Sequence, residues 1–369
     1  MPYRDNPAES LFPPVAFLWP ALAVASAGEM ASAFAHELAH LAAPDEAETA
    51  VPEPLWTTAN AVKLELPTMR LRDFSAGAGD GACLVCAPFA LHCSNIADFA
   101  SGHSLVETLR TNGLARLLVT DWRTATPEMC FMSIDSYLAD LNVAVDELGG
   151  KADLVGLCQG GWLALAYAAR FPDKVRKLVL AGAPVDIAAG RSALSTLAAD
   201  LPLSVFDALV ELGHGRMLGS RLLEQLGLPS PDADAIGRTL QLAAGTAPGR
   251  RRALVTSFER WYASTVDLPG TYYLQVVEWL FKQNRLAEGR FVALGRRIDL
   301  AQVRAPMFLV AADDDELVAP EQIFATERRV GTAPHNIEKA TAPGGHLSLF
   351  MGATTLARTW PRVGHWITA

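Results

Sequence analysis

Cys158 stands in the arrangement of residues that most directly predicts chemistry. The segment Gly156-Leu-Cys158-Gln-Gly160 follows a short apolar run and precedes an Ala/Leu-rich stretch, so a strand should lead into the cysteine and a helix should begin after it. A Cβ at either glycine of so sharp a turn would collide with a neighbouring strand or helix. The turn exposes the thiol at a helix N-terminus, where the helix dipole favours the reactive thiolate. The motif therefore predicts a cysteine nucleophile.

Two further residues follow Cys158 in the order that an acid and a histidine take in a triad of this kind. The apolar run 307–312 leads into a cluster of carboxylates, in which Asp315 best fits a loop just beyond a strand and Asp314 is the alternative. His346 lies in a Pro-Gly-Gly-His segment ahead of the last expected helix, a setting that no other of the eight histidines shares. We expect His346 to exchange the proton of Cys158, and Asp315 to fix the tautomer of His346.

Two backbone N–H groups should stabilise the oxyanion that forms when Cys158 attacks a carbonyl group. One belongs to Gln159, which directly follows the nucleophile. The other should come from the loop after the apolar run 82–88, where Ala90 is our candidate and Phe89 and Leu91 remain open.

The segments around these residues alternate between short apolar runs and helix-like stretches. The apolar runs are ACLVCAP, ARLLVTDW, DLVGL, KLVLAG and APMFLVAA. Runs of this length indicate strands buried on both faces, and hence a mostly parallel sheet with helices on either side. Between about residues 186 and 300 the alternation gives way to a helical texture without a clear strand. The sequence therefore predicts an α/β-hydrolase fold with a mostly parallel central sheet and a helical lid inserted between core strands.

The same alternation divides the chain into four segments. Residues 1–60 should form a helical extension and linker, 61–186 the first part of the core, 187–300 the cap or lid, and 301–369 the second part of the core. Residues 11–27 are apolar, but prolines interrupt them and no positive charge in excess precedes them, unlike a signal peptide. We expect a helix packed on the body or against a partner, with contact to a lipid-like or polymer surface as the alternative.

Composition argues against several other classes of protein. The chain has 369 residues, half of them apolar, with a net charge of −9 and no long run of Lys and Arg, so we expect no nucleic-acid binding. An odd count of five cysteines predicts reduced thiols and a cytoplasmic location. Cys83 and Cys86 form a CxxC within a strand-like run, and His36 and His40 belong to an HExxH motif without a third ligand. We therefore expect neither a metal nor a cofactor.

Taken together, these motifs resemble those of the polyhydroxyalkanoate synthases and, more distantly, of the intracellular polyhydroxybutyrate depolymerases. The resemblance runs from about Leu84 to the C-terminus. It covers the box around Cys158 with its second glycine, the Thr-Asp-Trp-Arg segment 120–123, the Ile-Asp-Leu segment 298–300, the cap segment 272–286 and the Pro-Gly-Gly-His segment that ends at His346.

The resemblance implies an acyltransferase that moves (R)-3-hydroxyacyl units from CoA thioesters to a growing polyester through Cys158. An acyl-enzyme on cysteine is a thioester, so the acyl group stays activated for transfer. Thiol-dependent hydrolysis of the same polyester stays open, because Glu316 stands where the synthases usually have a histidine and the loop PFALHCSNI is as similar to the depolymerases. A non-catalytic granule-associated protein is the alternative from another class. Acyl-CoA or polyester, a polymer-granule surface and a second copy in a homodimer are the partners considered.

Overall fold

A central sheet of eight strands carries the fold, in a computed structural model that describes residues 54–77, 79, 81–220 and 231–369. The expected N-terminal helix and the HExxH motif at His36 lie outside the described residues. The strand order across the sheet is β1 (Ala61–Glu65), β2 (Met69–Asp73), β6 (Arg116–Trp122), β3 (Ala82–Cys86), β7 (Ala152–Leu157), β8 (Val175–Ala181), β13 (Met307–Ala312) and β14 (Ile337–Ala342).

The sheet is mostly parallel, as predicted. β2 pairs antiparallel with both β1 and β6, and every pairing from β6 onward to β14 is parallel. Every residue of β3, β7 and β13 is buried, whereas burial alternates along the edge strand β14. This difference follows from position, because a central strand is covered on both faces and an edge strand is half-exposed.

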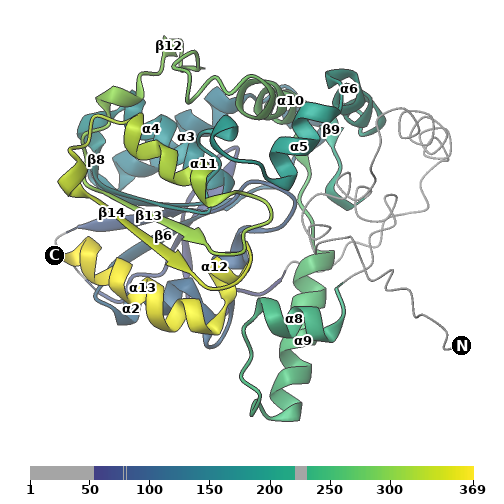
Figure 1. The fold of residues 1–369 in the computed structure, drawn as a ribbon, viewed down its shortest axis with the longest axis vertical. Coiled ribbons are helices and arrows are strands. Elements are labelled where there is room, and N and C mark those ends of the chain that lie inside the picture. Colours follow the sequence, from purple (N-terminus) through teal and green to yellow (C-terminus); the bar gives the residue numbers. More distant parts are fainter. Residues whose placement is uncertain (1–53, 78, 80, 221–230) are drawn as a thin grey trace, which may run out of the picture.

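Helices cover both faces of the sheet (Figure 1). α2 (Leu105–Thr111) packs with α13 (Ala353–Thr368) on one face, and α3 (Ile134–Glu147), α4 (Gln159–Arg170) and α11 (Pro320–Phe324) lie on the other. The side chains of Ser133 and Ser136 close a capping box at the start of α3. Short elements complete this part of the chain: β4 (Asp98–Ala100), β5 (His103–Ser104), α12 (Ser348–Met351) and 3-10 turns at Ser94–Ala97, Pro127–Met129, Pro172–Lys174, Ala325–Arg328 and Pro334–Asn336.

A helical insertion separates β8 from β13, as the sequence predicts. It contains the 3-10 turn Ile187–Ala189, α5 (Ala193–Asp200), α6 (Leu203–Leu212), α8 (Ala233–Thr239), α9 (Pro248–Ala263), α10 (Gly270–Gln275), the π-helix η7 (Val276–Lys282) and the 3-10 turn Leu300–Gln302. The expectation of a region without strands is wrong in detail, since two-residue strands pair as β9 (Arg216–Met217) with β10 (Leu268–Pro269) and β11 (Val292–Ala293) with β12 (Arg296–Arg297). Strands of two residues are too short to leave an alternating pattern in the sequence.

The insertion has two parts that differ in how they meet the core. α5, α6 and α10 lie beside the sheet and its helices, whereas α8 and α9 extend away from the body (Figure 1).

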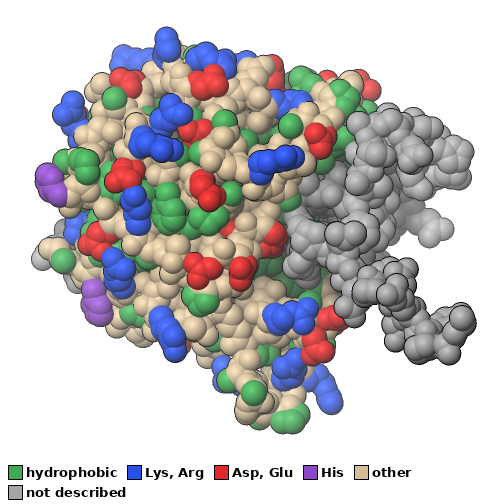
Figure 2. Space-filling model, viewed as in Figure 1, with side chains coloured by type: hydrophobic (Ala, Val, Ile, Leu, Met, Phe, Trp, Pro, Cys, Tyr) green, Lys and Arg blue, Asp and Glu red, His purple; other side chains and the backbone are tan. Residues whose placement is uncertain are grey.

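In the part of the chain that the structure describes, no single helix is long and apolar enough to span a membrane, although the pair α5 and α6, bent by 95°, meets the length and composition of a broken span. Acidic and basic side chains are intermixed over the face shown in Figure 2. The division of the chain at residues 187 and 300 remains a prediction.

An aromatic cluster joins the core, α3 and the insertion next to the loop that follows β3. Phe89 stacks on Tyr137 with ring centroids 4.7 Å apart, and Tyr137 lies 4.6 Å from Tyr272 of α10. Trp122, at the end of β6, packs against both Phe89 and Tyr137. These contacts anchor Phe89, which directly precedes Ala90. They therefore position the loop after β3, which borders the carboxyl end of β7.

Candidate active site

The turn between β7 and α4 holds Cys158 in a strained backbone conformation. Cys158 has φ 48° and ψ −119°, a backbone conformation that residues other than glycine rarely adopt. A Cβ on Gly156 would lie 2.5 Å from the Cα of Gly161, and one on Gly160 would overlap the backbone oxygen of Cys86. The close approach of backbone atoms therefore accounts for the predicted requirement for glycine on both sides of the cysteine.

His346 is fixed by a buried carboxylate. Its Nδ1–H donates to Oδ2 of Asp315 at 2.8 Å, and the two side chains are 1% and 0% exposed. The other oxygen, Oδ1, accepts the backbone N–H groups of Leu317 at 3.0 Å and Val318 at 2.9 Å. The carboxylate therefore cannot rotate without losing hydrogen bonds, and it imposes one orientation on the imidazole. Asp314, the alternative acid, is exposed instead.

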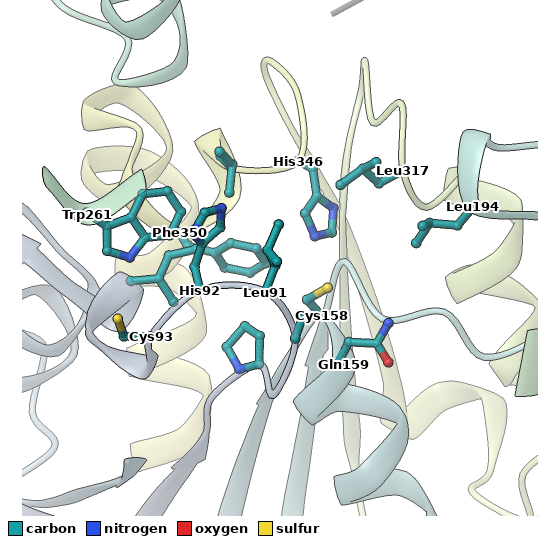
Figure 3. Close-up of a pocket in the computed structure, with 14 residues that line it drawn as sticks. Leu91, His92, Cys93, Cys158, Gln159, Leu194, Trp261, Leu317, His346 and Phe350 are labelled. Carbon is teal, nitrogen blue, oxygen red and sulfur yellow. The ribbon is translucent and has the colours of Figure 1, made fainter. Parts of the chain in front are cut away.

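The free edge of the His346 ring faces Cys158. Both residues line one pocket, and their side chains point toward one another in Figure 3. Nε2 of His346 is buried and has no hydrogen bond of ordinary geometry with the described residues. It is therefore available to exchange a proton with the thiol of Cys158. Burial lowers the pKa of His346, but the Asp315 carboxylate and the Cys158 sulfur outweigh this and hold that pKa well above its usual range. The arrangement favours an imidazolium beside the sulfur.

Glu316 contributes to the same corner of the site. It follows Asp315 directly. Burial, the largest influence, raises the pKa of Glu316 above its usual value, although the nearby backbone of His346 acts to lower the pKa of this carboxyl group.

The two predicted oxyanion-hole positions both reach the pocket. Gln159 and Ala90 line it, as does Leu91, whereas Phe89 turns its ring into the aromatic cluster and is not a lining residue. The side chain of Gln159 accepts a hydrogen bond from Nε1 of Trp162 at 2.5 Å, which holds the first turn of α4. The choice among Phe89, Ala90 and Leu91 remains a prediction, because the donor is a backbone N–H group and not a side chain.

The pocket is largely apolar, with a cavity volume of about 40 Å³. Its lining residues come from the loop after β3, the elbow, the insertion and the loops after β13 and β14: Pro88, Ala90, Leu91, His92, Cys93, Ile96, Cys158, Gln159, Leu194, Trp261, Leu317, His346, Leu347 and Phe350. His92 is the residue that sequence reasoning missed. Its place in the loop after β3 was the available signal, because that loop also carries the oxyanion-hole candidates.

The other predicted cysteine motif has no part in this pocket. Cys83 and Cys86 of β3 are free, fully buried thiols. Burial raises the pKa of Cys86 to about 12 and raises that of Cys83 well above its usual value, so neither thiol ionises near neutral pH. Within the described ranges, no group of three or more His, Cys, Asp or Glu side chains could hold a metal ion.

The strand order, the elbow and the helical insertion define an α/β-hydrolase fold. Solved structures with this fold superpose on the chain: a monoacylglycerol lipase of Paleococcus ferrophilus has a TM-score of 0.52 at 16% identity, with 81% of this chain and 98% of that chain covered. An enol-lactonase of Burkholderia xenovorans has a TM-score of 0.51 at 15% identity, with 82% and 97% covered. At such identities the likeness concerns the fold alone.

Within that fold, the chain belongs to the family described as "protein of unknown function (DUF3141)", whose model matches residues 82–343. The predicted resemblance to polyhydroxyalkanoate synthases is confirmed by distant relatives. A poly(3-hydroxyalkanoate) polymerase subunit PhaC of Synechocystis sp. is 28% identical over 287 residues, which cover 73% of each chain. The corresponding subunit of Haloferax mediterranei is 26% identical over 284 residues, covering 73% of this chain and 55% of that protein.

Proposed function

We propose that the protein is a cysteine-dependent acyltransferase that acts on (R)-3-hydroxyacyl thioesters and passes the acyl group to a hydroxyl of a polyester chain. The observation that carries this proposal is the Cys158 thiol on a strained elbow, facing a His346 ring whose far nitrogen is bound to the buried Asp315 carboxylate. Distant similarity to polymerase subunits supports the choice of substrate.

The proposed reaction has two steps that balance at Cys158. With the proton of Cys158 already held on Nε2 of His346, the sulfur attacks the thioester carbonyl, and CoA takes this proton from His346 and leaves as a thiol. The acyl group is then a thioester of the enzyme. A hydroxyl oxygen attacks this thioester, its proton moves to His346 and then to the departing Cys158 sulfur, and an ester forms. Backbone N–H groups of Gln159 and Ala90 would hold the oxyanion in both steps.

Transfer is favoured over hydrolysis by the energy of the intermediate and by the apolar surroundings of the sulfur. A cysteine thioester is close in energy to the CoA thioester that forms it, so no activation is lost in the first step. Cys158 is only 8% exposed in a pocket lined mainly by aliphatic and aromatic side chains, and limited access of water protects the intermediate.

The test supplies purified protein with 3-hydroxybutyryl-CoA and measures release of CoA with a thiol reagent, while polymer is isolated from the same reaction. We expect CoA release together with polymer, and loss of both in Cys158→Ala. Amorphous polyester granules are offered in a parallel reaction. Release of 3-hydroxy acids from the granules, without polymer formation from the thioester, would replace transfer by thiol-dependent hydrolysis. Absence of both reactions, with wild type and Cys158→Ala indistinguishable, would leave the granule-associated protein. A polymer-granule surface, a homodimer and a cytoplasmic location remain predictions.

A further inference from the structure

His92 is a buried polar side chain in the pocket that the proposed mechanism does not use. It is 6% exposed and lines the same pocket as Cys158, from the loop after β3 (Figure 3). Its ring packs against Trp261, with centroids 4.5 Å apart, and against Tyr262 at 5.1 Å. Neither ring nitrogen makes a hydrogen bond of ordinary geometry with any residue of the described ranges.

The ring of His92 is neutral. Burial lowers its pKa to about 3, although the nearby backbone of Ser264 opposes the fall. A neutral imidazole carries one N–H donor and one acceptor nitrogen, and it cannot serve as a base near neutral pH. His92 is therefore suited to binding an uncharged polar group and unsuited to proton transfer.

Apart from the backbone of Ser264, with which the ring makes no hydrogen bond of ordinary geometry, the surroundings of His92 offer it little to bind. Leu91, Ile96 and Phe350 line the pocket beside it, all of them apolar. The thiol of Cys93, the nearest polar neighbour along the chain, is already engaged with the backbone oxygen and the hydroxyl of Ser264, each at 3.2 Å. A buried polar atom without a partner is unfavourable, and a ligand that supplies the partner removes this cost.

We propose that His92 is a specificity-determining residue, which hydrogen-bonds the hydroxyl group of an acyl chain whose carbonyl carbon is at Cys158. The inference rests on the proposed function, because it takes an acyl group on Cys158 as the occupant of the pocket. A hydroxyl both donates and accepts, so it satisfies a neutral imidazole, whereas an unsubstituted acyl chain would leave the ring unpaired. The site should therefore select a short acyl chain with one neutral polar substituent and apolar carbon around it.

The experiment measures binding without turnover. Cys158→Ala protein is titrated calorimetrically with (R)-3-hydroxybutyryl-CoA and with butyryl-CoA, which differ by the hydroxyl group alone. We expect the hydroxylated ligand to bind about 5- to 100-fold more tightly, the range that one hydrogen bond to an otherwise unpaired buried group supplies. In Cys158→Ala/His92→Phe this ratio should fall to about one, since phenylalanine keeps the ring and lacks its nitrogens, and in Cys158→Ala/His92→Gln part of the ratio should return.

His103 provides a matched control. It is also a buried histidine, 3% exposed, but its Nδ1 is bound to the backbone oxygen of Met351 at 2.8 Å, and it does not line the pocket. His103→Phe in the Cys158→Ala background should keep the preference for the hydroxylated ligand, with circular dichroism establishing that each variant is folded. Equal affinities for the two ligands, binding of neither, or a preference that survives His92→Phe would overturn the inference.

The outcome is separable from that of the proposed function. A hydroxyl preference that depends on His92 supports the inference even if the wild-type protein neither polymerises nor hydrolyses. Conversely, polymer formation by a wild-type protein that binds both ligands equally would support acyl transfer and overturn the role of His92.

Discussion

The two ends of the pocket treat their polar groups in opposite ways. Beneath the loop after β14, the Asp315 carboxylate is bound by His346 and by two backbone N–H groups, so the charge is compensated inside the protein. At the other end, the ring nitrogens of His92 are buried beside the backbone of Ser264 and make no hydrogen bond of ordinary geometry in the described part of the chain. The first end is complete before a substrate arrives, as preorganised chemistry requires. The second end is incomplete, and a group left unpaired in an apolar pocket is a means of selecting what enters.

The same difference extends to charge. At the complete end, neighbouring groups raise the pKa of His346, so the imidazolium is retained beside Cys158. At the incomplete end, burial lowers the pKa of His92 to about 3, so its ring stays neutral. One pocket thus holds two histidines in different protonation states, and each state suits a different task.

Among substitutions at the complete end of the pocket, removal of the Cys158 sulfur should have the largest effect on the rate of reaction. We expect Cys158→Ala to lower the rate of CoA release from 3-hydroxybutyryl-CoA by about 10⁴- to 10⁶-fold, because the covalent step loses its nucleophile. Cys130→Ala is the control, since Cys130 is a free, half-buried thiol that does not line the pocket. A loss of less than tenfold in Cys158→Ala, or an equal loss in both variants, would contradict the role of Cys158.

Removal of one charge should have the next largest effect. Asp315→Asn keeps the shape of the side chain but disturbs the tautomer and orientation of His346, and we expect the rate of CoA release to fall by about 10³- to 10⁴-fold. Asp314→Asn is matched to it in chemistry and adjacent in sequence, but Asp314 is exposed, and its rate should stay close to that of wild type. Equal rates for the two variants would remove the distinction between the neighbouring carboxylates.

Two buried histidines allow a test of the incomplete end by stability. His92→Phe removes unpaired nitrogens, so the free energy of unfolding should stay unchanged or rise by about 1 kcal/mol. His103→Phe removes a satisfied group and leaves the Met351 backbone oxygen without its partner, so it should lower that free energy by about 1–3 kcal/mol. Urea unfolding of both variants measures the difference. A His92→Phe protein that is less stable than His103→Phe would mean that His92 is a structural residue.

The pH dependence of His346 tests whether its ring is charged at the complete end of the pocket. Because its pKa is raised above the value of about 6.5 in an unfolded chain, protonated His346 stabilises the fold, fully below about pH 6.5. This contribution is lost as pH rises through the raised folded-state pKa. NMR titration of the ring should give a midpoint above 6.5 in wild type, lowered in Asp315→Asn and, by a smaller amount, in Cys158→Ala, following the order of the two influences. A midpoint at or below 6.5 in wild type would contradict the charged pair.

Much of the fold could be predicted because its signals are local. The apolar runs of β3, β7 and β13 are long enough to identify buried strands. Ser133 indicates the start of α3, because serine is a favoured residue at a helix N-cap. The two-residue strands of the insertion could not be predicted, since their pairing depends on segments that meet only after the chain has folded.

By itself, the sequence determined the elbow and the order of the candidate groups around it. Five consecutive residues form the turn at Cys158, and glycines are required there because backbone atoms approach one another closely. Only the tertiary structure decided that Asp315 faces His346 and that His92 reaches the same pocket. The physical reason is that a loop residue's direction depends on which backbone N–H groups and which rings pack around it, and those partners come from distant parts of the chain.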